Sequence, residues 1–201
     1  MMKHKDNRRT LLYIHSSNEM YGADVILLQL VSRLDPTKFR IIIVVPTDLS
    51  YDGRLSKALT EHNIRVICMN LAVLRRSYFS LVRFPLYLWR FLLSLYLLIR
   101  LIQHEQVVLV HSNTLAVIPG AIAAKVMGIK HVWHVHEIIL KPRFLWKLTS
   151  WLAAHLADNV VSVSQATHEH LCAGNSKNAQ HGIVIYNGID TTKFQNEAQQ
   201  R

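Results

Sequence analysis

The chain of 201 residues is half hydrophobic and 18% charged, which excludes an intrinsically disordered protein and allows one well-buried domain. Its 23 Lys and Arg residues against 13 Asp and Glu residues give a formal charge of +10, which favours polyanionic partners: nucleic acid, anionic lipid headgroups or phosphorylated small molecules. The two cysteines, Cys68 and Cys172, form no CxxC pair, so we expect free thiols and a reducing, cytoplasmic compartment.

The basic segment 1–9 is expected to be a tail, because the apolar run behind it is too short for a secretion signal and no cleavage site follows. Beyond it, strands are predicted at 10–15, 40–46, 64–70, 106–112, 130–137, 158–164 and 182–187. Helices are predicted between them at 23–34, 55–62, 84–104, 115–127, 144–156 and 165–171. This alternation predicts an α/β fold with a doubly wound, Rossmann-like parallel sheet.

Several common catalytic and binding motifs are absent from the sequence. The glycines are too scattered for a GxGxxG or P-loop phosphate site, and there is no HExxH motif, no GxSxG elbow and no pair of aspartates two positions apart. We therefore predict neither a metal site nor a cofactor. The positive charge also comes without a recognised nucleic-acid-binding motif, so nucleic acid is not an expected partner.

Polar segments follow four of the predicted strands. They are "HSSNEMYGAD" at 15–24, "HSNT" at 111–114 with Ser112 and Asn113, "HVHE" at 134–137 and "SQAT" at 164–167. In an open parallel sheet, ligands bind outside the carboxyl ends of the strands. The sequence therefore predicts a binding site where these four segments meet.

The segment around Gly22 precedes an apolar helical pattern. Free N–H groups at a helix N-terminus, together with the positive end of the helix dipole, suit a phosphate. In the alternative interpretation, Gly22 only makes the turn and Asp24 only stabilises the first helical turn. The position directly after the first strand favours the phosphate site.

The "HVHE" segment places His134 and His136 on one face of a strand and Glu137 at the start of the next loop. An imidazole near neutral pH accepts a substrate proton, and a carboxylate orients a hydroxyl group or a histidine. A metal site is disfavoured because no third ligand accompanies the two histidines. The alternative interpretation of His134 is a buried position in the core. For His15 and His111, a core position and a functional role fit the sequence equally well.

The segment Leu81–Ile102 is the most apolar part of the chain. Arg90 and Arg100 limit its longest uncharged run to nine residues, which is too short for a membrane-spanning helix. On a helical wheel, one narrow stripe carries the polar residues of the segment, namely Arg83, Tyr87, Arg90 and Ser94.

Such a helix is either buried in the core or lies on a bilayer, with Trp89, Arg83 and Arg90 at the level of the headgroups. The preceding basic residues Arg75 and Arg76 favour an anionic membrane surface.

Four segments resemble, in order and spacing, the N-terminal half of family 4 glycosyltransferases. They are "YGADVILLQLVSRL", "HSNTLAVIPGAIAAKVMGIKHVWHVHE", "VVSVSQATHEHL" and "VIYNGIDTTKF". These enzymes are retaining, two-domain GT-B enzymes that use nucleotide sugars. The resemblance implies that an N-terminal Rossmann-like domain holds the acceptor, that a C-terminal domain holds the nucleotide sugar, and that the reaction occurs between them.

The resemblance also implies roles for particular residues. Gly22 and Ala23 match the glycine-rich loop of the family, with Tyr21 in place of its first glycine and Asp24 in place of its glutamate. His136, with Glu137 beside it, matches the histidine that contacts the sugar or the acceptor. The two remaining matches are Ser164 after the sixth strand and Asn187 at the crossing into the second domain.

We accordingly expect residues 10–186 to form the acceptor-binding domain and residues 187–201 to be an interdomain hinge and a truncated tail. The donor domain of the family carries two glutamates eight positions apart, and no such pair occurs here. We expect a lipid-linked acceptor, a peripheral position on the inner face of the cell membrane, and little transfer by this chain alone. The alternative is a noncatalytic binding module, either the truncated remnant of a broken gene or a subunit that docks on a separately encoded donor-binding half.

Overall fold

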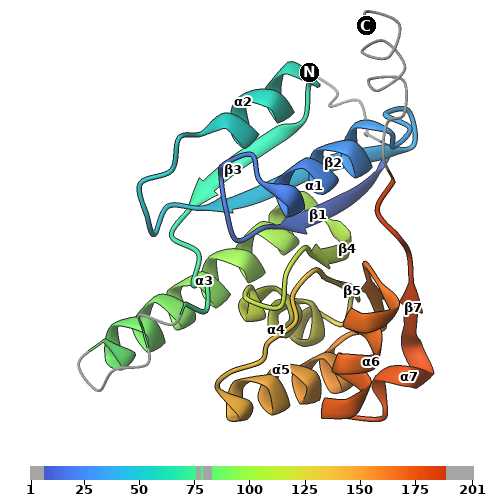
Figure 1. The fold of residues 1–201 in the computed structure, drawn as a ribbon. Helices are drawn as coiled ribbons and strands as arrows, with labels where there is room; N and C mark the ends of the chain where they lie inside the picture. Colours follow the sequence, from blue (N-terminus) through green and yellow to red (C-terminus); the bar gives the residue numbers. More distant parts are fainter. Residues whose placement is uncertain (1–6, 76–77, 79–82, 189–201) are drawn as a thin grey trace, which may run out of the picture.

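The computed structural model describes residues 7–75, 78 and 83–188, in which parallel strands form one sheet (Figure 1). The strands are β1 (Arg9–Ile14), β2 (Phe39–Pro46), β3 (Arg65–Met69), β4 (Val107–Ser112), β5 (Lys130–Val135), β6 (Asn159–Ser162) and β7 (Gly182–Val184). Their order in the sheet is β3-β2-β1-β4-β5-β6-β7. The doubly wound, Rossmann-like fold predicted from the sequence is confirmed.

Helices cover both faces of the sheet (Figure 1). They are α1 (Gly22–Ser32), α2 (Arg54–Glu61), α3 (Phe84–Glu105), α4 (Ile118–Met127), α5 (Arg143–Leu156), α6 (Gln165–Gly174) and α7 (Asn178–His181). The helices α1 and α2 form one layer, and α3, α4 and α5 form the opposite layer. Each predicted helix is present, and only the four-residue α7 was missed, because so short a segment carries no periodic pattern.

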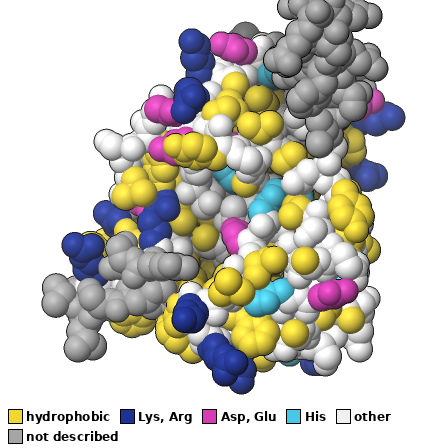
Figure 2. All heavy atoms as spheres, viewed as in Figure 1, with side chains coloured by type: hydrophobic (Ala, Val, Ile, Leu, Met, Phe, Trp, Pro, Cys, Tyr) yellow, Lys and Arg dark blue, Asp and Glu magenta, His cyan; other side chains and the backbone are white. Residues whose placement is uncertain are grey.

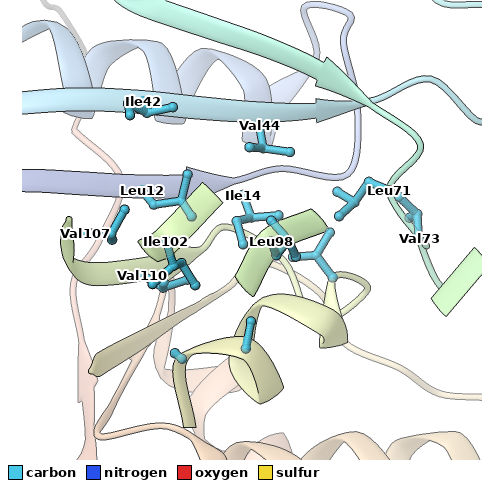
Figure 3. Packing of buried hydrophobic residues seen from close by; sticks show 13 residues of the cluster. Leu12, Ile14, Ile42, Val44, Leu71, Val73, Leu98, Ile102, Val107 and Val110 are labelled. Atoms are coloured by element: carbon cyan, nitrogen blue, oxygen red, sulfur yellow. The ribbon is translucent and has the colours of Figure 1, made fainter. Parts of the chain in front are cut away.

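The core consists of apolar clusters on both sides of the strands. On one face, Leu27 and Val31 of α1 pack with Leu55 of α2 against β1 and β2. On the other face, Leu98 and Ile102 of α3 pack with side chains of β1, β2 and β4 (Figure 3). Strands buried on both faces become almost continuously apolar, and this explains runs such as 41–45 in β2.

Local chemistry accounts for the positions of element ends. The helix α4 begins at Ile118, three residues after the predicted start, with Pro119 in its first turn, where the missing N–H of proline costs nothing. It ends at Met127, and Gly128 caps it with a φ of 64°. The strand β5 ends at Val135, two residues earlier than predicted, so His136 and Glu137 both lie in the loop that follows it.

The helix α3 buries two of the four residues of the polar stripe that the sequence marks. Its buried residues include Tyr87 and Ser94, and the Ser94 hydroxyl accepts a hydrogen bond from the backbone N–H of Ala72. By length and composition alone α3 would suffice to cross a membrane, a criterion that core helices of soluble proteins also meet. In Figure 1 its N-terminal half extends past the strands, and the exposed side chains there are apolar.

Candidate functional site

The strand order reverses between β1 and β4, and this switch point is where the chain gathers polar side chains. His15 follows β1, Asn113 follows β4, and His136 and Glu137 follow β5. Because β1, β4 and β5 are neighbours in the sheet, the residues after them lie at one edge. We call His15, Asp24, Asn113, His136 and Glu137 the rim site.

His15, Asp24 and Asn113 form a buried hydrogen-bonded network. His15 Nε2 lies 2.7 Å from Asp24 Oδ1, and the Asn113 amide nitrogen lies 3.1 Å from His15 Nδ1. The same amide nitrogen donates to the carbonyl oxygen of Ala23. Because the amide is a donor, His15 Nδ1 accepts and its Nε2 donates to the carboxylate. The network joins residues after β1 and β4 to the first turn of α1.

The start of α1 is fixed by hydrogen bonds of Asp24 and leaves space beside Gly22. Asp24 Oδ2 accepts a hydrogen bond from the backbone N–H of Tyr21, and bonds with His15 and Tyr21 lower the pKa of the Asp24 carboxyl despite its burial. Gly22 is exposed, and a methyl group built on it would meet no atom within 4 Å. Asp24 is therefore a positioning group, whereas Gly22 and Ala23 leave open space at the positive end of the helix dipole.

A row of aromatic rings runs across the strands on the α1 side of the sheet. Tyr13 stacks on His111 with ring centroids 4.7 Å apart, His111 meets His134 at 5.5 Å, and His134 meets His136 at 4.3 Å. Figure 2 shows histidine side chains near the middle of one face of the molecule, beside an acidic side chain. Burial lowers the pKa of His134 to about 4 and that of His136 to about 3, so both rings are neutral at pH 7.

Glu137 is an acid in an apolar environment. Burial raises its pKa to about 7, although its carboxylate accepts weak hydrogen bonds from the backbone N–H groups of Leu115 and His136, at 3.4 and 3.2 Å. A carboxyl group with a pKa near 7 exchanges a proton at neutral pH. Such a shift, together with the position beside the switch point, is typical of functional carboxylates.

The other predicted residues lie in three different places. Ser112 is fully buried beside the Nε2 atom of His131, at 3.0 Å, so it lies away from the rim site. Ser164 caps α6 by accepting from the backbone N–H of Thr167. Asn187 is exposed and lines a cavity of about 280 Å³ between α1 and the segment after β7, with His134 also in its wall.

A second buried network at the same edge was not predicted. Arg75 Nε lies 2.6 Å from the Asp48 carboxylate, which also accepts from Tyr51, and Arg75 contacts the carbonyl oxygen of Ser16. The sequence suggested Arg75 as a cation for lipid headgroups. In the structure its guanidinium forms an ion pair and hydrogen bonds within the chain. No local pattern marks Arg75, since Asp48 is 27 positions away.

Two further predictions concern metal and membrane contacts. The part of the chain that the structure describes holds no group of three His, Cys, Asp or Glu side chains suited to a metal ion. Arg90 is half-buried and donates to the hydroxyl oxygen of Tyr78 at 2.5 Å, whereas Trp89 is 63% exposed and Arg83 is exposed. Arg76 and residues 189–201 lie outside the described residues.

The model of the family described as Glycosyltransferase Family 4 matches residues 20–193. The chain belongs to this family. The match contains the whole rim site except His15, and it confirms the resemblance inferred from the four sequence segments. No curated protein sequence gives a significant match.

Solved structures share the fold of this family 4 domain at low sequence identity. HepE from Anabaena in complex with UDP-glucose is 19% identical over 95% of this chain and 49% of its own, with a TM-score of 0.69. A glycosyltransferase from Rickettsia africae is 19% identical over 95% of this chain and 46% of its own, with a TM-score of 0.66.

The fold is also similar to that of an epimerase. The UDP-GlcNAc 2-epimerase from Neisseria meningitidis, bound to UDP-GlcNAc, is 13% identical over 94% of this chain and 53% of its own, with a TM-score of 0.59. The family 4 domain spans about half the length of the solved structures it matches. The likeness therefore shows a Rossmann-like domain of the GT-B type.

Proposed function

We propose that this domain is the acceptor-binding half of a retaining glycosyltransferase that moves a sugar from a nucleotide sugar to a lipid-linked acceptor in the synthesis of a surface polysaccharide or glycolipid. The observation that carries the proposal is the rim site of a family 4 chain, in which residues after three neighbouring strands lie at one edge of the sheet and those after β1 and β4 are bonded to the start of α1. The complex of HepE with UDP-glucose supports a nucleotide sugar as donor. The donor is held mainly by a second domain, as the family resemblance implies.

Each rim residue has a role in this proposal. Glu137 holds an acceptor hydroxyl, because its carboxyl group both accepts and donates hydrogen bonds near pH 7. The neutral His136 orients the sugar or the acceptor, and its Nε2 atom is buried without a hydrogen-bond partner among the described residues. Gly22 and Ala23 present backbone N–H groups toward the leaving diphosphate, whose charge the dipole of α1 favours.

The layer of α3, α4 and α5 supports a position on an anionic bilayer. Trp89, Leu92 and Tyr96 of α3 are 55–63% exposed, and Phe144 and Trp151 of α5 are at least half exposed. Between residues 62 and 157 the only acidic residues are Glu105 and Glu137. Exposed aromatic side chains on a surface with few acids suit the headgroup region of an anionic membrane.

Binding of sugars to the full chain tests the proposal. We expect ligand-observed NMR titrations to detect binding of at least one methyl glycoside from a panel of glucose, galactose and N-acetylglucosamine derivatives. Glu137→Gln and His136→Ala should each weaken this binding by about ten-fold, the equivalent of one good hydrogen bond. The matched control is Glu61→Gln, an exposed acid at the end of α2, which should leave the affinity unchanged.

The proposal fails if no glycoside of the panel binds, or if binding survives both rim substitutions at full strength. It also fails if UDP-glucose binds the chain tightly while every glycoside is excluded, because the domain would then hold the donor.

A further inference from the structure

A second cavity lies next to Glu137, on the side of the sheet that α4 and α5 cover. Its volume is about 260 Å³, and its apolar lining includes Leu74, Leu115, Ile138 and Leu145. Leu115 belongs to the core cluster that joins α4 and α5, and Leu74 packs against the same cluster. The cavity is therefore framed by firmly packed side chains.

Two ionisable side chains line the same cavity, Glu137 and Lys141. The Glu137 carboxylate is held by the backbone N–H groups of Leu115, in the cavity wall, and of His136, in the rim site. Glu137 therefore belongs to both the rim site and the cavity. Lys141 is exposed, and no acidic residue occurs from 138 to 157.

Exposed apolar side chains lie in the cavity wall and at nearby positions of the chain. Ile138 in its wall is 44% exposed, and the neighbouring Leu140 and Phe144 are 73% and 57% exposed. On the other side, Leu74 packs with Phe91 of α3 beside Tyr87. Apolar side chains are thus found both on this exposed surface and in the wall of the cavity that Glu137 lines.

We infer that this cavity binds the first part of the apolar chain of a lipid-linked acceptor, with Lys141 contacting the phosphate between sugar and lipid and Glu137 facing the acceptor sugar. The inference rests on the proposed function and specifies where the lipid of the acceptor lies. Burying methylene groups in an apolar cavity is favourable, whereas a free sugar gains nothing from these walls. A cation next to such a cavity suits the phosphate of a lipid phosphate ester.

Alkyl chain length is the decisive variable. We expect the affinity of the full chain for alkyl β-glucosides, measured below their micelle concentrations, to rise from methyl through butyl and hexyl to octyl. Each added pair of buried methylene groups should strengthen binding roughly fifteen-fold until the cavity is full. Ile138→Asp should abolish this gain and leave the methyl glucoside affinity unchanged, whereas Val108→Asp, a matched control at 45% exposure on β4, should keep it.

Binding of octyl phosphate tests the proposed contact between Lys141 and the phosphate. Lys141→Gln should weaken octyl phosphate binding about ten-fold and leave octyl glucoside binding unchanged. Lys57→Gln, an exposed lysine on α2 in the opposite layer, should change neither affinity.

The outcomes separate this inference from the proposed function. If methyl glucoside binds in a Glu137-dependent manner but chain length has no effect, the inference is wrong and the proposed function stands. If the gain with chain length survives Ile138→Asp or disappears equally in Val108→Asp, the alkyl chain binds elsewhere or the fold is damaged, and the inference is wrong. If neither methyl nor octyl compounds bind, both are overturned.

Discussion

The two helix layers of this domain differ sharply in their charges. Six of the 13 acidic residues lie between 19 and 61, the segment that builds α1, α2 and the loops beside them, and only two lie between 62 and 157. Several of the first group are paired, such as Asp24 with His15 and Asp48 with Arg75. The α3–α5 layer instead exposes aromatic and aliphatic side chains. One sheet thus supports a polar network on one side and an apolar, cationic surface on the other.

We propose that the two layers have different roles. Residues of the first layer are held by mutual hydrogen bonds, which fix the geometry of the rim site. The exposed side chains of the second layer are mostly apolar, and we propose that they face an extended partner such as a bilayer.

The largest expected effect is acid unfolding driven by the buried histidines. Burial lowers the pKa of His131 and His134 to about 4 and that of His136 to about 3, and it lowers that of His111 well below its usual value. The unfolded chain then binds more protons than the folded chain below about pH 6.5. Stability therefore falls as the pH drops from 6.5 toward 4, by several kcal/mol in total.

Urea unfolding between pH 7.5 and 4.5 measures this loss. His134→Gln should make the pH dependence shallower, and His62→Gln, an exposed histidine directly after α2, should leave it unchanged. If the free energy of unfolding changes with pH to the same extent in both variants, the row of aromatic rings does not cause the pH dependence.

The next largest effect is expected at the centre of the polar network. Asp24→Ala leaves His15 without its 2.7 Å partner in a buried site, and we expect a loss of about 3 kcal/mol in the free energy of unfolding. Glu61→Ala, an exposed acid on α2, should change it by less than about 0.5 kcal/mol. Chemical denaturation at pH 7 compares the two, and similar losses would remove the distinction between paired and exposed acids.

Glu137→Gln should act in the opposite direction. The pKa of Glu137 is raised to about 7, so the folded chain binds more protons than the unfolded chain between about pH 4.5 and 7, and stability declines as the pH rises through that window. A neutral amide avoids this cost, so the variant should be more stable than the parent by about 2–3 kcal/mol at pH 8.

The gain from Glu137→Gln should fall to about 1 kcal/mol or less at pH 5, where the folded carboxyl group is protonated and only the unfolded one is still partly ionised. Denaturation curves at pH 8 and pH 5 provide the measurement. If the variant and the parent differ in stability by the same amount at both pH values, the cause is a change in packing and not the ionisation of Glu137.

The smallest expected effect concerns the apolar layer. Trp89→Asp combined with Trp151→Asp should reduce partitioning onto phosphatidylglycerol-containing vesicles about ten-fold in a sedimentation assay, because both exposed indole rings are lost. Leu49→Asp, which is 53% exposed on the loop after β2, is the matched control and should partition like the parent.

Neutral phosphatidylcholine vesicles, or high salt, should weaken partitioning of the parent. Equal binding to neutral and anionic vesicles would contradict the electrostatic part of the comparison. Absence of binding to both would contradict the membrane position itself.

The sequence alone determined the fold class and the edge where the site lies. Alternating β-branched and helical patterns are local properties, and each predicted strand was found with its ends shifted by a few residues. The polar segments after the strands meet because parallel strands end at the same edge. The family resemblance rested on such segments and was confirmed over residues 20–193.

Only the tertiary structure decided which partners the side chains have and which faces are covered. The helix α3 is apolar around most of its circumference, so its pattern does not reveal that Tyr87 and Ser94 face inward. The bond between Asn113 and His15 spans 98 positions of the chain. Such contacts depend on how the elements pack, and periodicity carries no information about distant partners. For the same reason, the raised pKa of Glu137 becomes visible only when the surrounding apolar side chains are in place.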